Sequence, residues 1–562
     1  MKKEHIVDLF ILMMITFLIK GSYIFCNHQL YFYSDQIGTL ALPAYLSGRD
    51  WSDVLANTPY YGFGYYWIFS FLFKLTTDYK IIYSTILVIN FLLTEFIQIL
   101  IYEICRRYCG DRVQSVFLAI LSGAMYAYWV DITNEHPLFF GVWLVVGIIL
   151  ICSRVDKTKR ILLSISLAVL LSYLVLVHER ALALLMGVVA ALLFLRIFTV
   201  NVVNLISFFP SLAISFVLGR WIKNKYLFLM YGQSSLMNSS VIDKEIANNF
   251  SISDVRGMVL CFATNIYKAL MTSYGILIIS FVIGCVILKL LLFKRKESKF
   301  IIDRNSGIIA VFLSCGFAFV ITLLGLAYSQ GGYLNYALTN HVDSQSFKSL
   351  FYLRYYEVYL GPLFMTTFAL KRQLGVEIKA YNILIIIPLL LYKMFVANVL
   401  DIVWESKYGL KHMDFSPIYI DWHGNVEYGD YVFSTVFSLC ILSIIMILII
   451  KEKTRYSQII AFIVMVMLLP HNFQLEKLSV QSDYDLIYDE IKNIDAREKP
   501  NELYVYGMNY NTAQFIFNDF KIIGIDELDN YKSGILLSGR DLGELENSRH
   551  RLLSEQQHIY IK

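Results

Sequence analysis

Asp35 follows the first long apolar stretch of the chain and stands between Ser34 and Gln36. An aspartate with an ordinary pKa is ionised at neutral pH, so its carboxylate can accept a proton from a reacting group within hydrogen-bond reach. The alternative is structural, because Asp is a favoured N-cap and a helix is expected to begin near Ile37. Asp35 is therefore the leading candidate for a general base, with helix capping as the competing role.

Arginines between the apolar stretches are candidates for binding an anion. Arg354 precedes Glu357 by three residues. It can hold a phosphate with its planar guanidinium, or it can pair with that carboxylate one helical turn away. Arg180 belongs to the sequence His178-Glu179-Arg180 at the end of another apolar stretch, where the alternative is an arginine that extends its charge to the membrane surface. Two further candidates are Arg220 and Lys223.

Other polar and aromatic residues complete the candidate binding set. Glu135 and His136 can orient a substrate or Asp35, or they can be ordinary solvated loop residues. Aromatic side chains can stack on a sugar ring, although such residues also form the belt at membrane interfaces. The aromatic candidates are Tyr33, Tyr60, Tyr61, Tyr66 and Trp67.

The sequence predicts no metal site and no cofactor. Asp35 has no acidic neighbour, and the spacing of the eight cysteines fits neither a zinc site nor a disulfide framework. No second histidine lies four residues after His178, as a zinc-protease helix requires, and Gly62-Phe63-Gly64 lacks the strand and helix of a nucleotide-binding loop.

The composition indicates a protein embedded in a membrane. Apolar residues make up 57% of the chain and charged residues 16%, whereas soluble domains carry about 25% charged residues. The apolar runs are about 17–25 residues long, which fits spanning helices and not the short alternating strands of a membrane barrel. The net charge of +4 is too small to suggest a nucleic-acid partner.

Hydropathy predicts an all-α polytopic membrane protein with about thirteen transmembrane helices. The predicted spans are 6–26, 81–104, 114–130, 138–153, 161–177, 181–198, 202–219, 272–293, 306–327, 355–370, 381–399, 431–450 and 457–470. The first is expected to be a retained helix, because no small-residue cleavage site follows it. Glu95 lies near the centre of the second span, where it is expected to hydrogen-bond to a neighbouring helix.

Basic residues occupy alternate short loops, and this alternation predicts the topology. The basic loops lie at 106–112, 154–160, 196, 294–296, 371–372 and 451–455. The positive-inside rule places these loops and the N-terminus in the cytoplasm and the C-terminus outside the cell membrane.

Four larger segments and the polar tail then lie outside. The segments are 27–80, 220–271, 328–354 and 400–430. Within the tail, strands are predicted at 502–506, 520–525, 534–538 and 558–561, with a helix at 511–518. The chain is therefore divided into a transmembrane domain at 1–470, with the candidate site in its loop 27–80, and a small extracytoplasmic α/β domain at 471–562.

This layout resembles the GT-C superfamily of membrane glycosyltransferases, which includes aminoarabinose transferases, protein O-mannosyltransferases and bacterial oligosaccharyltransferases. In that family an acidic residue follows the first span, an aromatic helix of the type Pro-x-x-Tyr-Trp precedes the second, and paired arginines end the second. The matching residues here are Asp35, the segment from Pro59 to Trp67, and Arg106-Arg107. Further matches are Asn134-Glu135-His136-Pro137 and the segment from Leu353 to Glu357. Metal-dependent members carry paired acids where this chain has Asp35 alone.

The resemblance implies an inverting glycosyltransferase of the cell envelope that acts on the outer face of the membrane. Its donor would be a sugar linked to a polyprenyl phosphate, and its acceptor a cell-wall glycopolymer, a lipid or a protein. Asp35 would accept the proton of the acceptor, and Arg354 or Arg180 would hold the departing lipid phosphate.

Two other functions compete with this reading. A transporter or flippase of lipid-linked saccharides predicts charged groups along the spans and an internal repeat, and neither is evident. A non-catalytic partner of a polymerase predicts that Asp35 can be replaced without loss.

Overall fold

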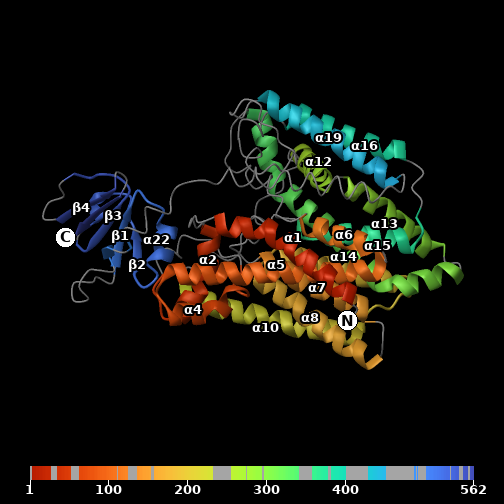
Figure 1. Cartoon of the computed structure of the whole chain (residues 1–562), viewed down its shortest axis with the longest axis horizontal. Helices are drawn as coiled ribbons and strands as arrows, with labels where there is room; N and C mark the ends of the chain where they lie inside the picture. Colours follow the sequence, from red (N-terminus) through yellow and green to blue (C-terminus); the bar gives the residue numbers. More distant parts are fainter. Residues whose placement is uncertain are drawn as a thin grey trace.

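The computed structural model shows a helical bundle with a small β-sheet at one end (Figure 1). It describes residues 3–26, 34–51, 62–109, 112–124, 136–153, 157–231, 255–273, 275–293, 296–340, 357–376, 381–399, 428–450, 487–488, 490–491, 502–531, 533–543, 549–554 and 557–561. The sheet lies beyond α2 (Ser34–Leu46) and α4 (Ser70–Leu75), at the end of the molecule away from the start of the first helix.

Apolar helices form the bundle and make the chain a multi-pass membrane protein. They are α1 (Lys3–Cys26), α5 (Tyr79–Cys109), α6 (Arg112–Ala124), α7 (His136–Cys152), α8 (Lys157–Val177), α9 (Ala181–Ile197), α10 (Leu205–Tyr231), α12 (Val255–Thr272), α13 (Ile276–Leu292), α14 (Lys296–Asn340), α15 (Glu357–Gln373), α16 (Tyr381–Asn398) and α19 (Tyr428–Ile450). Within the described ranges, α5, α8, α10 and α14 are each long and apolar enough to cross a membrane, and α12 with α13 forms a bent pair. Twelve of the predicted spans coincide with helices, and the span at 457–470 lies outside the described residues.

The segment 220–271 departs from the prediction, which treated it as a loop. α10 continues to Tyr231, and α12 occupies 255–272. Hydropathy misses α12 because it carries Asn265 and Lys268, although both side chains are buried in the bundle. Packing on α14 explains the helix: a Cβ on Gly257 would overlap the carbonyl oxygen of Gly331 in α14, and a Cβ on Gly331 would overlap Met258 of α12. α14 is also much longer than the predicted span 306–327, with 45 residues.

Glu95 makes the interhelical hydrogen bond that its position predicts. Its side chain is buried in α5, and the Thr16 hydroxyl of α1 donates to Glu95 Oε2 at 2.6 Å. A carboxyl group inside a bundle needs such a donor, because an unpaired polar group there loses its hydration without compensation. The contact fixes α1 against α5.

Several helix ends with basic residues meet at the end of the bundle opposite the sheet. Gln373 Nε2 donates to the carbonyl of Tyr108 at 3.0 Å, beside the paired arginines of α5. Arg160 Nε donates to the carbonyl of Ser153 at 3.1 Å, and Ser153 Oγ donates to the carbonyl of Val202 at 2.7 Å. The ends of α5, α7 and α15 and the start of α8 therefore share one surface of the bundle, which is called here the basic end.

The sheet has five strands in the order β2-β1-β3-β5-β4. The strands are β1 (Glu502–Tyr506), β2 (Lys521–Gly524), β3 (Ile535–Ser538), β4 (Arg549–Ser554) and β5 (Gln557–Ile561), and α22 (Tyr510–Ile516) connects β1 to β2. β1 runs parallel to β2 and β3, whereas β5 is antiparallel to β3 and β4. The four predicted strands and the predicted helix are confirmed within a few residues. β4 is absent from the prediction, because this edge strand has a polar sequence without the usual strand pattern.

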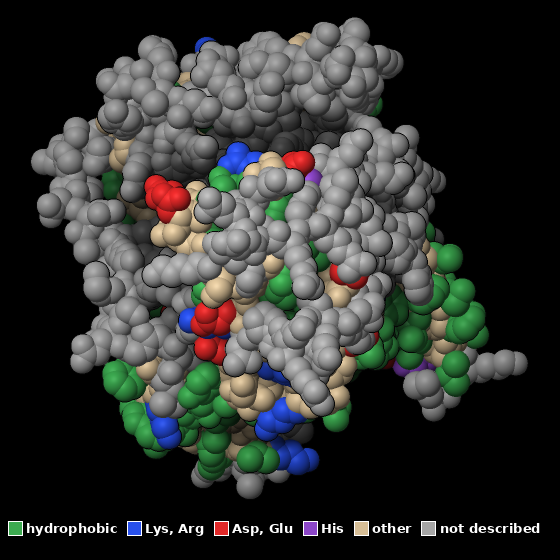
Figure 2. Space-filling model, turned by 90° about the vertical axis from the view of Figure 1, so that its left-hand side faces the viewer, with side chains coloured by type: hydrophobic (Ala, Val, Ile, Leu, Met, Phe, Trp, Pro, Cys, Tyr) green, Lys and Arg blue, Asp and Glu red, His purple; other side chains and the backbone are tan. Residues whose placement is uncertain are grey.

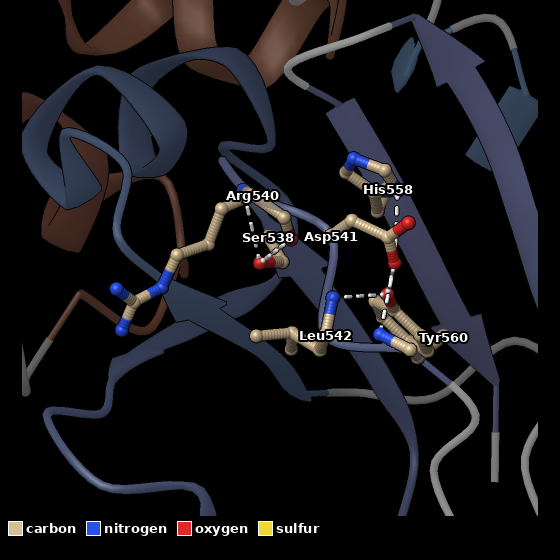
Figure 3. A network of polar contacts seen from close by, with 7 residues as sticks. Ser538, Arg540, Asp541, Leu542, His558 and Tyr560 are labelled. Carbon is tan, nitrogen blue, oxygen red and sulfur yellow. Dashed lines mark hydrogen bonds and ion pairs between the residues drawn. The ribbon is translucent and has the colours of Figure 1, made fainter.

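A hydrogen-bonded turn follows β3 and closes onto β5 (Figure 3). The Leu542 amide donates to the Tyr560 hydroxyl at 2.8 Å, and that hydroxyl donates to Asp541 Oδ1 at 3.1 Å. Burial raises the pKa of Tyr560. His558 Nδ1 lies 4.0 Å from Asp541 Oδ1. The buried Ser538 hydroxyl donates within the same turn, so these groups form a structural network and not a nucleophilic triad.

Candidate active site

Asp35 is the second residue of α2, on the helix that follows α1. α2 begins at Ser34, three residues earlier than expected, so the prediction that Asp35 caps a helix starting near Ile37 is wrong in register. A carboxylate in the first turn is still favoured by the helix dipole. The side chain of Asp35 lies outside the described part of the chain.

The far half of α2 is packed firmly onto the bundle. Leu42 of α2 forms a small buried cluster with Phe63 and with Leu227 of α10. The chain leaves the helix through Gly48, which has a φ of +89° that glycine adopts without strain. Arg49 Nη2 then donates to the carbonyl of Phe73 in α4 at 2.9 Å. These contacts fix the helix that carries Asp35 on the side where the sheet lies.

The segment 62–67 runs against the end of α8 at backbone contact distance. The amides of Phe63 and Gly64 donate to the carbonyl of Leu176 at 3.0 and 2.8 Å. A Cβ on Gly62 would lie well inside van der Waals contact of the Val177 carbonyl oxygen. The two glycines therefore serve a close approach of two backbones, a role that sequence spacing alone does not reveal.

The aromatic residues of this segment divide into buried and exposed ones. Tyr66 is 1% exposed, and its ring packs edge-on against Tyr65 at 4.5 Å. Trp67, in the short 3-10 helix η1 (Tyr66–Phe69), is 46% exposed. Of the two described aromatic candidates, Trp67 is therefore the exposed one, whereas Tyr66 belongs to the core. Tyr33, Tyr60 and Tyr61 lie outside the described residues.

The sequence His178-Glu179-Arg180 forms the turn between α8 and α9, next to the Gly62–Gly64 contact. Glu179 forms an ion pair with Lys223 of α10, and the side chains of both residues are largely buried. The Arg180 amide donates to His178 Nδ1 at 3.1 Å. The Arg180 side chain interacts electrostatically with Tyr359, in the first turn of α15. Its Nη1 atom is buried, unlike the head group of an arginine that extends into water.

The structure therefore brings together three sequence-distant parts of the predicted site. These are the aromatic segment with Trp67, the turn with Arg180, and the start of α15, where Glu357 is the first residue. His136 is likewise the first residue of α7. The side chains of Glu357 and His136, and all of Arg354 and Glu135, lie outside the described residues. Figure 2 looks onto the end of the molecule where the sheet lies, and the described acidic and basic side chains there are interspersed among apolar ones.

The sheet contacts the elements that hold this site. The Trp51 indole Nε1 donates to the carbonyl of Asn518 at 3.2 Å, and Asn518 Nδ2 donates to the carbonyl of Thr77 at 2.9 Å. The ring of Phe515 in α22 packs edge-on against Tyr83 of α5 at 6.4 Å. α22 is therefore docked at the end of the α2 segment and at the start of α5.

The described residues contain no group of three or more His, Cys, Asp or Glu side chains that could hold a metal ion. Near the site they place the partly buried Glu179–Lys223 ion pair and Arg180, whose Nη1 atom is buried. Lys223 was a minor candidate in the sequence, and its pairing with Glu179 could not be read there, because the two residues lie on different helices.

No protein-family model matches the sequence, and no curated protein matches it. Among solved structures, the crystal structure of ArnT from Cupriavidus metallidurans bound to undecaprenyl phosphate has a similar fold. The match covers 98% of this chain and 97% of that chain, with a TM-score of 0.50 and 11% sequence identity. ArnT is a GT-C glycosyltransferase, so the resemblance to that superfamily is confirmed at the level of the fold.

Proposed function

We propose that this protein is a membrane glycosyltransferase that moves a sugar from a polyprenyl-phosphate donor to a cell-envelope acceptor. The observation that carries the proposal is the similarity in fold, over nearly the whole chain, to an enzyme crystallised with undecaprenyl phosphate. A fold alone hosts many functions. The added support is local: Asp35 is in the first turn of α2, and the far half of that helix packs on Phe63, whose segment leads to Trp67 and contacts the end of α8.

The proposed reaction needs a proton acceptor, and Asp35 is assigned that role. A hydroxyl or amide of the acceptor attacks the anomeric carbon as the bond from that carbon to the phosphate oxygen breaks. The electron pair of the broken bond leaves with the polyprenyl phosphate, and the acceptor's proton passes to the Asp35 carboxylate. Attack on the face opposite the departing phosphate inverts the anomeric configuration.

The departing phosphate needs a cation, and Arg354 and Arg180 are assigned to it. Arg354 precedes the first residue of α15 by three positions, and Arg180 interacts with Tyr359 of the same helix. Two arginines together would suit a phosphate, because guanidinium groups bind its oxygens in pairs. The sugar is assigned to Trp67, with Tyr33, Tyr61, Glu135, His136 and Glu357 as the remaining contacts.

The proposed location is the cell membrane, with the N-terminus in the cytoplasm and the site and sheet outside. The clustering of helix ends at the basic end, away from the sheet, supports this orientation through the positive-inside rule. The acceptor is proposed to be a glycopolymer, a lipid or a protein of the cell envelope.

The test is release of lipid phosphate by the purified protein from a polyprenyl-phosphate sugar, with extracts of cell-envelope polymers, lipids and proteins as acceptors. We expect acceptor-dependent release that Asp35→Asn lowers by about 10²–10⁴-fold. A protein that moves the donor lipid across vesicles without releasing phosphate would be a flippase, and the proposed function would fail. Release that persists in Asp35→Asn would instead remove only the general-base assignment.

A further inference from the structure

A hollow of about 380 Å³ lies between the ends of α5 and α7, at the basic end of the bundle. From α5 it is lined by Glu103, Arg106, Arg107 and Tyr108. From α7 it is lined by Ile148, Ile151 and Cys152. Along α5 this place is about 40 Å from the start of the helix, where α22 is docked, because an α-helix rises about 1.5 Å per residue. The hollow is therefore remote from the candidate active site.

The charges of the hollow favour an anion. Two guanidinium groups line it, and Arg107 has no hydrogen-bond or ion-pair partner within the described ranges of the chain. Arg106 contacts His5 of α1 through Nη1 and Nδ1. The lining carboxylate, Glu103, lies 2.9 Å from the other nitrogen of His5. Glu103 and Arg106 thus both contact α1 through His5, and Arg107 is the lining guanidinium without such a contact in the described ranges.

Neighbouring helices add positive charge around the same opening. Arg160 donates to the carbonyl of Ser153, the residue after Cys152. Gln373 donates to the carbonyl of Tyr108, which brings the basic last turn of α15 beside the hollow. Arginines at the end of α5, the start of α8 and the end of α15 therefore all contribute positive electrostatic potential at this opening.

The walls identify the source of the anion as a lipid. Ile148 and Ile151 extend the lining from the charged mouth into the apolar part of α7. Arg106 and Arg107 stand at the end of the apolar stretch of α5, where the head groups of a bilayer lie. A free phosphate gains no binding energy from an apolar wall. A lipid can place its phosphate at the mouth of the hollow and its acyl chains along such a wall. Basic pockets between transmembrane helices bind anionic head groups for this reason.

We propose that this hollow is a binding site for the phosphate head group of an anionic membrane lipid. Arg106 and Arg107 hold the phosphate oxygens, and Ile148 and Ile151 contact the upper part of the acyl chains. The site does not belong to the transfer reaction, because it lies at the other end of α5.

The experiment measures retained lipids by native mass spectrometry of the full chain in detergent. The probes are phosphatidylglycerol, phosphatidylcholine and inorganic phosphate. We expect wild-type protein to prefer phosphatidylglycerol to phosphatidylcholine, and Arg107→Gln to weaken phosphatidylglycerol binding about tenfold, because one charge-assisted contact is lost. Arg304→Gln is the matched control, since Arg304 is an exposed arginine of α14 outside the lining.

The position of the bound lipid is tested in the same preparation through Cys152, which lines the hollow and is partly exposed. Bound phosphatidylglycerol should slow alkylation of Cys152, read by peptide mass, and this protection should be lost in Arg107→Gln. Equal binding of the two lipids, equal effects of Arg107→Gln and Arg304→Gln, or binding that leaves Cys152 reactive would each overturn the proposal. Competition by inorganic phosphate at the affinity of the lipid would show a phosphate site and not a lipid site. None of these outcomes depends on sugar transfer.

Discussion

The indole Nε1 of Trp51 donates a hydrogen bond of 3.2 Å to the main-chain carbonyl of Asn518, and the two residues are 467 positions apart in sequence. Trp51 is 2% exposed, and its ring packs edge-on against Phe73 of α4. Asn518 also donates through its side chain to Thr77. One residue of the sheet module, the region 487–561, thus holds both the segment that follows α2 and the segment that precedes α5.

Loss of this contact should loosen the sheet module. Trp51→Phe keeps an aromatic ring but leaves a buried carbonyl without its donor, which costs about 1–3 kcal/mol. We expect limited proteolysis to release a resistant fragment starting near residue 480, and to release it faster from Trp51→Phe than from wild type. Trp221→Phe is the control, because Trp221 is 60% exposed on α10. Equal release rates for the two variants would mean that the Trp51 contact does not hold the module.

Replacement of Asp35 tests the proton acceptor. Asp35→Asn keeps the size of the side chain and most of its hydrogen bonds, so detergent stability and donor binding should persist. Turnover should fall by about 10²–10⁴-fold, the usual contribution of a general base. Asp50→Asn changes an exposed aspartate of the same segment and should leave turnover nearly unchanged. Near wild-type turnover in Asp35→Asn would end the catalytic assignment and leave a role in the first turn of α2.

The arginines assigned to the phosphate should affect donor affinity as well as turnover. A guanidinium that binds the phosphate in the ground state, and binds it more tightly as negative charge develops in the transition state, contributes to both quantities. Arg354→Ala and Arg180→Ala should therefore raise the donor KM and lower kcat. The measurements are transfer kinetics and donor binding, together with detergent stability. If Arg354 only pairs with Glu357, its alanine variant will lose stability or behave normally, without a selective loss of donor affinity.

Gly62→Ala tests the close approach of segment 62–67 to α8. The added Cβ would overlap the Val177 carbonyl oxygen, and overpacking of this kind costs about 1–3 kcal/mol. We expect a lower melting temperature in detergent and reduced transfer, because Trp67 and the turn at Arg180 shift together. Gly325→Ala is the control, since nothing lies within 4 Å of a Cβ at Gly325. A Gly62→Ala protein as stable as Gly325→Ala would show that the segment moves without cost.

Much of the fold follows from local sequence, as α8 and β1 show. Continuous apolar sequence places the end of α8 at Val177 as predicted, although the helix begins four residues earlier, and the alternating burial of β1 matches the predicted strand at 502–506. α12 could not be predicted from local sequence, because Lys268 lowers the hydropathy of the segment. In the structure that side chain is buried, and the helix packs closely on α14. Prediction of this helix would require knowledge that Gly257 and Gly331 meet.

The candidate site divides in the same way. Asp35 is recognisable as a carboxylate after the first span, and its placement on a helix follows from local signals, although the register was off by three residues. The proximity of Arg180 to α15, the Glu179–Lys223 pair and the contact of Trp51 with Asn518 join residues on separate elements. No periodicity or spacing encodes such contacts, so they require coordinates.

The long separation of Trp51 from Asn518 also has a consequence for biosynthesis. At about 5–20 residues per second, the ribosome needs roughly 20–90 s to synthesise the chain between them. Throughout that interval α2 is already made, but the residue that anchors its following segment does not yet exist. Assembly of this region is therefore a late event, completed only after the intervening helices have been synthesised. A nascent chain halted before α22 would contain Asp35 but not the support that the finished protein gives to its helix.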